Sequence, residues 1–313
     1  MRIIFLGTPE FAIPSLEALI QEKDIEIPLV ISQVDKRRSR NKFEPTPVKK
    51  YALEAGLLVE TPEKINRKEW IDRLQDLKAD FLIVVAYGQI IGKRLLNAFP
   101  DRIVNIHGSI LPKYRGAAPI QRSLLDGLDE TGVTAMLIDE GMDTGDMLGI
   151  RKLPIVASDD LNSLSEKLAK EGADLLMDTL KNFPAHYAKR IKQNDQEATY
   201  AQKIEKSDGY LNFEGPGRKI FDQVRCLKDW PGAKFMVDGQ IYKVHQVKLE
   251  DFVKDKKPRQ IVFADAKGIG INSKDKLVVI SIIQAMNRKK MEVEAFLRGN
   301  DFPIDKKVEM VRD

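Results

Sequence analysis

The sequence predicts an α/β protein in which an open, doubly wound (Rossmann-like) sheet is followed by a smaller β-rich domain. Short apolar runs alternate with amphipathic segments in the first part of the chain; a polar stretch and then glycine-punctuated, strand-like runs follow. Consecutive parallel strands need a crossover that a helix supplies, so the alternation indicates parallel pairing. Because 313 residues exceed most single cores, we expect two domains, 1–184 and 207–313, joined by a linker at 185–206.

The first domain begins with a strand at 3–6, which ends at the turn Gly7-Thr8-Pro9. Apolar residues then recur with helical spacing from Phe11 to Ile20, so a helix follows the turn. A last, long helix begins near 161, where Ser158-Asp159 offers its N-cap. The other elements predicted in this domain are strands at 28–32, 81–86, 103–106, 133–138 and 147–155, and helices at 48–55 and 71–77.

The second domain is predicted to be a small β-barrel or a sandwich, because its apolar runs are short, β-prone and closely spaced. Turns at Asp238-Gly239, Gly268 and Gly270 separate these runs. The predicted strands lie at 233–237, 242–247, 260–263 and 277–283.

Composition argues against several classes of protein. The net charge of +4 is mild for a dedicated nucleic-acid binder, and one cysteine excludes an internal disulfide. The three histidines lie too far apart for a short metal-ligand motif, so we expect no metal. The apolar runs are too short for a signal peptide or a membrane span, so we expect a cytoplasmic protein.

In an open α/β sheet, ligands bind beyond the carboxyl ends of the strands. In this chain those positions are Gly7-Thr8-Pro9, Tyr87-Gly88 and His107-Gly108-Ser109. Strand alternation puts Asn105 and His107 on the same side, so both can address one ligand. The alternative is a partly buried histidine beside a turn-forming asparagine.

Two further loops are candidates for a site. The loop at 109–121 is marked by glycine and proline, as loops that shape ligand sites often are. Within it we expect Arg115 to be an ordinary solvated charge. Asp143 and Asp146 flank Thr144-Gly145, where aspartate is typical of a turn because its side chain bonds nearby backbone amides. These residues by themselves favour a structural role for the two aspartates.

Together the motifs resemble the methionyl-tRNA formyltransferase family over nearly the whole chain. The matching segments are 5–12, 85–88, 105–109, 111–112, 115–121, 139–145 and 230–233, together with Arg225. The resemblance implies a formyltransferase domain at 1–184 and an OB-like barrel at 207–313 that helps hold transfer RNA. It also implies that 10-formyltetrahydrofolate is the co-substrate and that the α-amine of methionyl initiator tRNA is the acceptor, in the service of translation initiation.

By the same resemblance, Asn105, His107 and Asp143 are the catalytic residues. The Asn105 amide and the His107 imidazole would donate hydrogen bonds to the oxyanion of a tetrahedral intermediate. Asp143 would either orient His107 or take the amine proton through water. The residues implied in folate binding are Ser109, Ile110, Leu111, Pro112, Tyr87 and Gly88.

The basic loop at 36–42 differs from the family, which usually carries a proline and glycines there. The resemblance implies that this loop contacts the acceptor stem of transfer RNA through Arg37, Arg38, Arg40 and Lys42. The alternative is a solvated surface loop. Basic clusters at 49–50, 256–259 and 288–290 are further candidates for phosphate neutralisation.

Two competing functions are weighed against this one. A formyltransferase acting on a nucleotide sugar, or a formyl-folate hydrolase, would share the first domain but not the tail at 207–313. A dinucleotide-binding oxidoreductase would carry spaced glycines after the first strand, whereas Gly7 is followed by Thr8-Pro9-Glu10-Phe11-Ala12. We expect the tRNA-directed enzyme, a monomer with initiator methionyl-tRNA and tetrahydrofolate as partners and no membrane.

Overall fold

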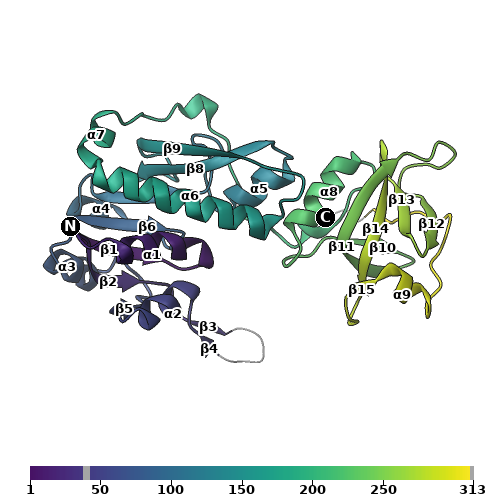
Figure 1. Ribbon diagram of the computed structural model, residues 1–313, viewed down its shortest axis with the longest axis horizontal. Coiled ribbons are helices and arrows are strands. Elements are labelled where there is room, and N and C mark those ends of the chain that lie inside the picture. Colours follow the sequence, from purple (N-terminus) through teal and green to yellow (C-terminus); the bar gives the residue numbers. More distant parts are fainter. Residues whose placement is uncertain (38–42, 311–313) are drawn as a thin grey trace. The chain divides into compact units, whose positions relative to one another are not determined.

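The computed structural model describes residues 1–37 and 43–310 (Figure 1). Contacts divide the chain into two compact units. The first consists of Met1–Pro119, Glu130–Pro154 and Ser163–Ala201, and the second of Ile120–Asp129, Ile155–Asn162 and Gln202–Asp313. Two short stretches, 120–129 and 155–162, thus belong to the second unit although segments of the first unit follow them in the chain, which no sequence pattern indicated. The domain limits and the linker at 185–206 stay a prediction.

The first unit is built on a seven-stranded sheet. Its strands are β1 (Arg2–Gly7), β2 (Glu26–Ile31), β5 (Val59–Glu60), β6 (Phe81–Val85), β7 (Ile103–His107), β8 (Glu130–Leu137) and β9 (Met147–Pro154). They lie in the order β5-β2-β1-β6-β7-β8-β9. The first five are parallel, whereas β8 and β9 add an antiparallel hairpin to the β7 side. The predicted doubly wound sheet is confirmed.

Helices cover this sheet. They are α1 (Ile13–Gln21), α2 (Pro47–Glu54), α3 (Lys68–Asp76), α4 (Lys93–Ala98), α6 (Leu161–Lys181) and α7 (Phe183–Ala188), with the 3-10 turns η1 (Glu10–Ala12) and η3 (Asp195–Glu197). The predicted helices are confirmed, and α4 and α7 are additions of six residues each, too short to show a period. Thr46 caps α2 by accepting a hydrogen bond from Lys49 N at 3.2 Å.

The long helix α6 runs along the sheet (Figure 1) and supports the strand that carries the candidate site. Its apolar residues, among them Leu164, Leu168 and Leu176, are buried, as their spacing predicts. A Cβ added at Gly172 would lie 2.9 Å from Ile106 Cγ2 in β7, so glycine permits this close approach. The helix begins at Leu161, slightly later than the predicted cap at Ser158-Asp159.

The second unit is a curled antiparallel sheet. Its strands are β10 (Lys234–Val237), β11 (Gln240–Asp251), β12 (Ile261–Asp265), β13 (Gly268–Asn272), β14 (Lys276–Ala285) and β15 (Met291–Glu292), and its helices are α8 (Gly217–Cys226) and α9 (Val293–Leu297), with the 3-10 turn η4 (Ser207–Gly209). The main path runs β10-β11-β14-β13-β12, and β15 pairs with β14. All four predicted strands are confirmed.

The helix α5 (Pro119–Leu125) begins at Pro119 of the first unit, and its other residues belong to the second unit.

The strand β13 was not predicted, because Gly268 and Gly270 were interpreted as turn residues. In the structure both belong to the strand. A Cβ at Gly270 would lie 2.5 Å from the Phe263 ring of the neighbouring β12, so this glycine makes room for an aromatic side chain.

The C-terminal segment bridges the open side of the curled sheet. Ile261 N donates to Lys306 O and Val308 N donates to Arg259 O, each at 2.9 Å. Glu309 N then donates to Met236 O at 2.8 Å, on the opposite edge strand β10. Residues 306–309 thus hydrogen-bond to both edges of the sheet, and the predicted barrel-like architecture is confirmed over the sandwich.

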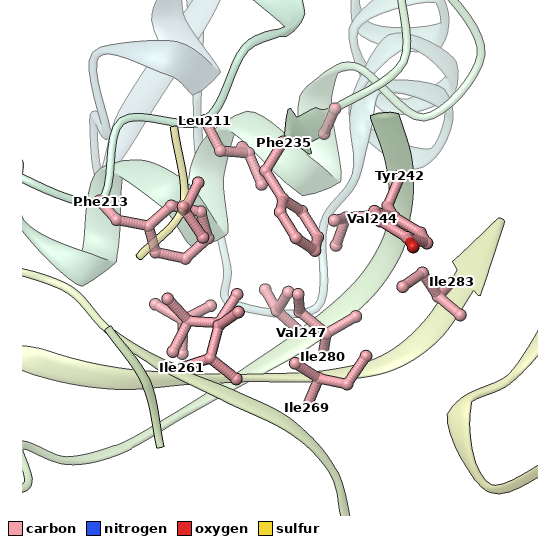
Figure 2. Close-up of a cluster of buried hydrophobic side chains, with 14 of the residues drawn as sticks. Leu211, Phe213, Phe235, Tyr242, Val244, Val247, Ile261, Ile269, Ile280 and Ile283 are labelled. Atoms are coloured by element: carbon pink, nitrogen blue, oxygen red, sulfur yellow. The ribbon is translucent and has the colours of Figure 1, made fainter. Parts of the chain in front are cut away.

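An aromatic-rich core fills this half-barrel. Figure 2 shows Phe213 and Phe235 over aliphatic side chains such as Ile261 and Ile280, with Tyr242 beside Val244 and Ile283. The Phe235 and Tyr242 rings stack, with centroids 5.6 Å apart.

A search of the described residues for a membrane-spanning helix, one both long and apolar, finds none.

Candidate active site

Asn105 and His107 lie at the carboxyl end of β7, in the middle of the sheet. Asn105 pairs with Val84 of β6, and His107 pairs with Thr134 of β8. Asn105 is half-buried, whereas His107 is only 6% exposed. Strand alternation therefore places the two side chains on one face, as predicted.

The His107 imidazole is held on both of its edges. Nε2 lies 2.9 Å from the carbonyl oxygen of Tyr114, and because a carbonyl only accepts, Nε2 carries a hydrogen. Nδ1 lies 3.6 Å from Asp143 Oδ2, an ion-pair separation that is longer than a hydrogen bond. The structure thus brings His107 and Asp143 together, although 35 residues lie between them in the sequence.

Asp143 sits in a turn that has little freedom. Its φ is +54°, in the left-handed region, and its Oδ2 accepts a hydrogen bond from Gly116 N at 2.8 Å. Asp139 Oδ1 accepts from Gly141 N at 3.0 Å and from Thr144 Oγ1 at 2.6 Å. The turn therefore directs the Asp143 carboxylate toward the histidine.

Asp146 has different surroundings from Asp143. It forms an ion pair with Arg190, with 3.0 Å between Asp146 Oδ2 and Arg190 Nε. Next to it, a Cβ at Gly145 would lie 1.9 Å from Leu137 O, so only glycine fits there. The two aspartates of the motif, equivalent by sequence pattern, are thus separated by their contacts.

The loop that follows His107 is anchored through Ser109 and Leu111. Ser109 Oγ donates to Lys113 O at 2.7 Å, and Thr134 Oγ1 donates to Ser109 O at 2.7 Å. Leu111 packs in the interior with Met136 and Met147. Ile110 and Pro112 are partly exposed, so these two and the loop backbone are best placed to contact a ligand. Folate binding by this loop stays a prediction.

Tyr87 and Gly88 follow β6, where the backbone turns through positive φ at Ala86 and Gly88. The Tyr87 side chain is 1% exposed within the hydrophobic core, and burial raises the pKa of its hydroxyl. Its carbonyl accepts from Thr8 Oγ1 at 2.7 Å. A ligand contact at this position would therefore use the backbone.

The basic loop is only partly described. β3 (Lys36–Arg37) pairs with β4 (Phe43–Glu44), with Arg37 opposite Phe43. Arg38, Arg40 and Lys42 lie outside the described residues. Their predicted contacts with transfer RNA, and that of Arg37, stay a prediction.

Arg115 was predicted to be a solvated charge, and that prediction is wrong because the residue is only 1% exposed. Its Nε donates to Gln193 Oε1 at 3.0 Å, and its Nη2 lies 2.9 Å from Asp195 Oδ1. The second contact is an ion pair by distance but is not aligned as a hydrogen bond. Gln193 gave no signal in the sequence, because it stands in a polar stretch without periodicity. Within residues 1–37 and 43–310, no group of three or more metal-ligating side chains is found.

Both halves of the chain match known family models. A model described as "Formyl transferase" matches residues 1–180, and one described as "Formyl transferase, C-terminal domain" matches residues 203–301. The chain is 43% identical over 301 residues to the methionyl-tRNA formyltransferase of Finegoldia magna, covering 96% of this chain and 97% of that protein. It is 40% identical over 302 residues to the methionyl-tRNA formyltransferase of Sulfurihydrogenibium sp., with 96% and 97% covered.

Two solved structures share the fold. HypX from Aquifex aeolicus in complex with tetrahydrofolic acid superposes with a TM-score of 0.64 at 18% identity, covering 96% of this chain and 47% of HypX. WlaRD, a sugar 3N-formyl transferase, superposes with a TM-score of 0.65 at 21% identity, covering 92% of this chain and 99% of WlaRD. The full-length relatives carry the assignment further than the fold does, and they establish that the chain belongs to the methionyl-tRNA formyltransferase family.

Proposed function

We propose that this protein transfers the formyl group of 10-formyltetrahydrofolate to the α-amine of methionyl initiator tRNA. The observation that carries the proposal is the 43% identity to a methionyl-tRNA formyltransferase along 96% of the chain, through both units. The sugar formyltransferase shares the fold at 21% identity, too distant to assign an acceptor. In the reaction, the amine nitrogen bonds to the formyl carbon, the bond from that carbon to the folate nitrogen breaks, and the amine proton passes to the folate.

The charge that must be stabilised is the oxyanion of the tetrahedral intermediate. Asn105 and His107 lie on one face of β7 at its carboxyl end, where two donors can converge on one oxygen. Because Nε2 of His107 donates to the Tyr114 carbonyl, only the Nδ1 edge is left for the oxyanion, and it can donate there only when Nδ1 carries a hydrogen as well. Loss of one donor of this kind typically lowers the rate about 10²- to 10³-fold.

The position of Asp143 supports a role in proton transfer. An α-amine has a reference pKa of about 8 and is largely protonated at neutral pH, so the nucleophile must lose a proton. The Asp143 carboxylate lies 3.6 Å from His107 Nδ1, and its side chain is 22% exposed. This placement supports both an orienting role toward His107 and proton removal through water.

Transfer RNA binding requires cationic groups that are not already neutralised. Lys256 and Arg259 of the predicted clusters form ion pairs with Asp305 and Glu214. In the same unit, Lys234 Nζ lies 3.3 Å from Lys206 O, and burial together with the positive charges of Lys243 and Lys206 lowers the pKa of Lys234. We infer that this triad of lysines, Lys206, Lys234 and Lys243, contacts phosphates, since a phosphate would relieve their mutual repulsion.

The test is formyl transfer to initiator methionyl-tRNA beside elongator methionyl-tRNA, an amino-sugar nucleotide and a reaction without acceptor. The expected result is product on the initiator alone. Product on the sugar nucleotide, or formate released without acceptor, would reassign the acceptor and retain the catalytic residues. No reaction with any acceptor would refute the enzyme assignment. The cytoplasmic location and the monomeric state stay predictions, checked by fractionation and by light scattering.

A further inference from the structure

One short piece of chain contacts both loops that hold His107. The 193–201 segment hydrogen-bonds to the loop at 114–118, because Arg115 N donates to Thr199 O at 2.9 Å and Ala201 N donates to Arg115 O at 2.7 Å. Tyr114, whose carbonyl binds His107 Nε2, donates its own N–H to Thr199 Oγ1 at 2.9 Å. One side of the imidazole is thus anchored to this segment.

Gln193 links the same segment to the other side of the imidazole. Its Nε2 lies 2.8 Å from Asp143 O and 2.8 Å from Gly145 O, and its side chain is buried. Its Oε1 accepts the hydrogen bond from Arg115 Nε. Carbonyls only accept and arginine only donates, so all three contacts require the same orientation of the Gln193 amide.

Arg115 completes the connection between the two loops. It belongs to the 114–118 loop and is buried, with Gln193 on its Nε and Asp195 of the 193–201 segment beside its Nη2. The path from Tyr114 through Arg115 and Gln193 to Asp143 therefore closes a ring of contacts around His107. Each member of this ring is held by at least one hydrogen bond shorter than 3.1 Å.

We propose that Gln193 is a positioning residue that keeps the Asp143 carboxylate in place beside His107 Nδ1. This inference rests on the proposed function. Asp143 has a φ of +54°, so its carbonyl and its carboxylate are directed by one constrained backbone position. The two hydrogen bonds from Gln193 hold the backbone side of the turn, while Gly116 N and His107 Nδ1 face the carboxylate. Release of the backbone side would let the carboxylate shift.

The decisive variant is Gln193→Glu, because it keeps the length of the side chain and an acceptor for Arg115. It removes both amide hydrogens and places a carboxylate oxygen against two carbonyls. We expect kcat to fall about 10- to 100-fold, as displacements of about 1 Å in a catalytic group do. The KM values for both substrates are expected to change less than about 3-fold, since no substrate contact is lost. Gln193→Met, which removes the amide altogether, should show the same split between kcat and KM.

A double-mutant cycle separates positioning from general damage. If Gln193 acts through the Asp143 carboxylate, adding Gln193→Glu to Asp143→Asn should lower kcat by less than about 3-fold further. The matched control is Gln196→Glu, the same chemical change at an exposed position of the same segment, which should leave kcat unchanged. Thermal unfolding of each variant checks that the fold is retained.

The outcomes are distinguishable. An inactive wild-type protein would refute the proposed function itself. An active wild-type protein with an equally active Gln193→Glu variant would refute only the positioning role. Independent, multiplying losses in the double mutant, or losses that appear in KM, would likewise overturn it.

Discussion

The two units each contain a buried arginine, and the two arginines are paired in different ways. Arg225 in α8 is 5% exposed and forms an ion pair of 2.7 Å with Asp222, which is itself 1% exposed. Its Nη1 also donates to Val156 O at 3.0 Å and to Asp159 O at 2.9 Å. Arg115 is as deeply buried, but it is paired with a neutral amide and with Asp195, whose side chain is 82% exposed.

The difference indicates two uses of a buried charge. Arg225 and Asp222 compensate each other inside the second unit, and the hydrogen bonds of Arg225 to Val156 O and Asp159 O hold that stretch against α8. A broken buried pair is costly because one charge is left without compensation. Arg115 instead leads, through Gln193, to the turn that carries Asp143, and its carboxylate partner remains in water. We therefore expect substitutions near Arg225 to affect stability and substitutions near Arg115 to affect catalysis.

The largest effect is expected at the catalytic end of this comparison. Asp143→Asn should lower the rate of formyl transfer about 10²- to 10⁴-fold, because positioned proton transfer contributes that much. The variant should unfold within about 2 °C of the wild-type protein, since the amide keeps an oxygen that can accept from Gly116 N. Single-turnover formylation and thermal unfolding measure the two quantities. Near-normal turnover of the Asp143→Asn variant would show that Asp143 has no catalytic role.

The opposite result is expected at the structural end. Arg225→Met should destabilise the protein by about 3 kcal/mol, because Asp222 remains buried and loses its buried cationic partner, while its contact with the exposed Arg218 stays. Denaturant unfolding measures this loss. The kcat of the folded variant should stay within about 2-fold of wild type, since no catalytic group moves. A large loss of kcat without a loss of stability would break the comparison.

A smaller loss of stability is expected within the sheet of the second unit. Gly270→Ala brings a Cβ within 2.5 Å of the Phe263 ring, and overpacking of this kind costs about 1–3 kcal/mol. Gly239→Ala serves as a control with open space, because nothing lies within 4 Å of its added Cβ, although its positive φ adds some strain. Equal stability of wild type and Gly270→Ala would show that Phe263 moves aside freely.

The smallest effect is expected on the surface of that unit. Lys234→Gln should weaken binding of initiator tRNA modestly and reduce the slope of log affinity against log salt by about 1, as loss of one phosphate contact does. Lys256→Gln, at a lysine that is paired with Asp305, is the matched control and should change the slope less. Filter binding across a salt series gives both slopes. An unchanged slope for Lys234→Gln would exclude that residue from the RNA contact.

Much of the fold could be predicted because its signals are local. The buried strands β1, β6 and β7 are continuous apolar runs, and α6 shows its period over 21 residues. Elements were missed where the sequence pattern was too short or had another interpretation. α4 has too few residues for a period, and the glycines of β13 resemble turn residues until Phe263 is seen packed against Gly270.

The residues of the candidate site also fall into two groups, those placed by local strand geometry and those placed by tertiary contacts. Strand alternation by itself put Asn105 and His107 on one face at the ligand edge of the sheet, because side-chain direction in a strand depends only on position. The turn pattern alone did not distinguish Asp143 from Asp146; the family resemblance implied Asp143, and contacts between residues far apart in the chain separate the two in the structure. The burial of Arg115 likewise depends on such contacts. Gln193 is the clearest case: its hydrogen bonds join three separate segments, and only the tertiary structure brings such partners within reach.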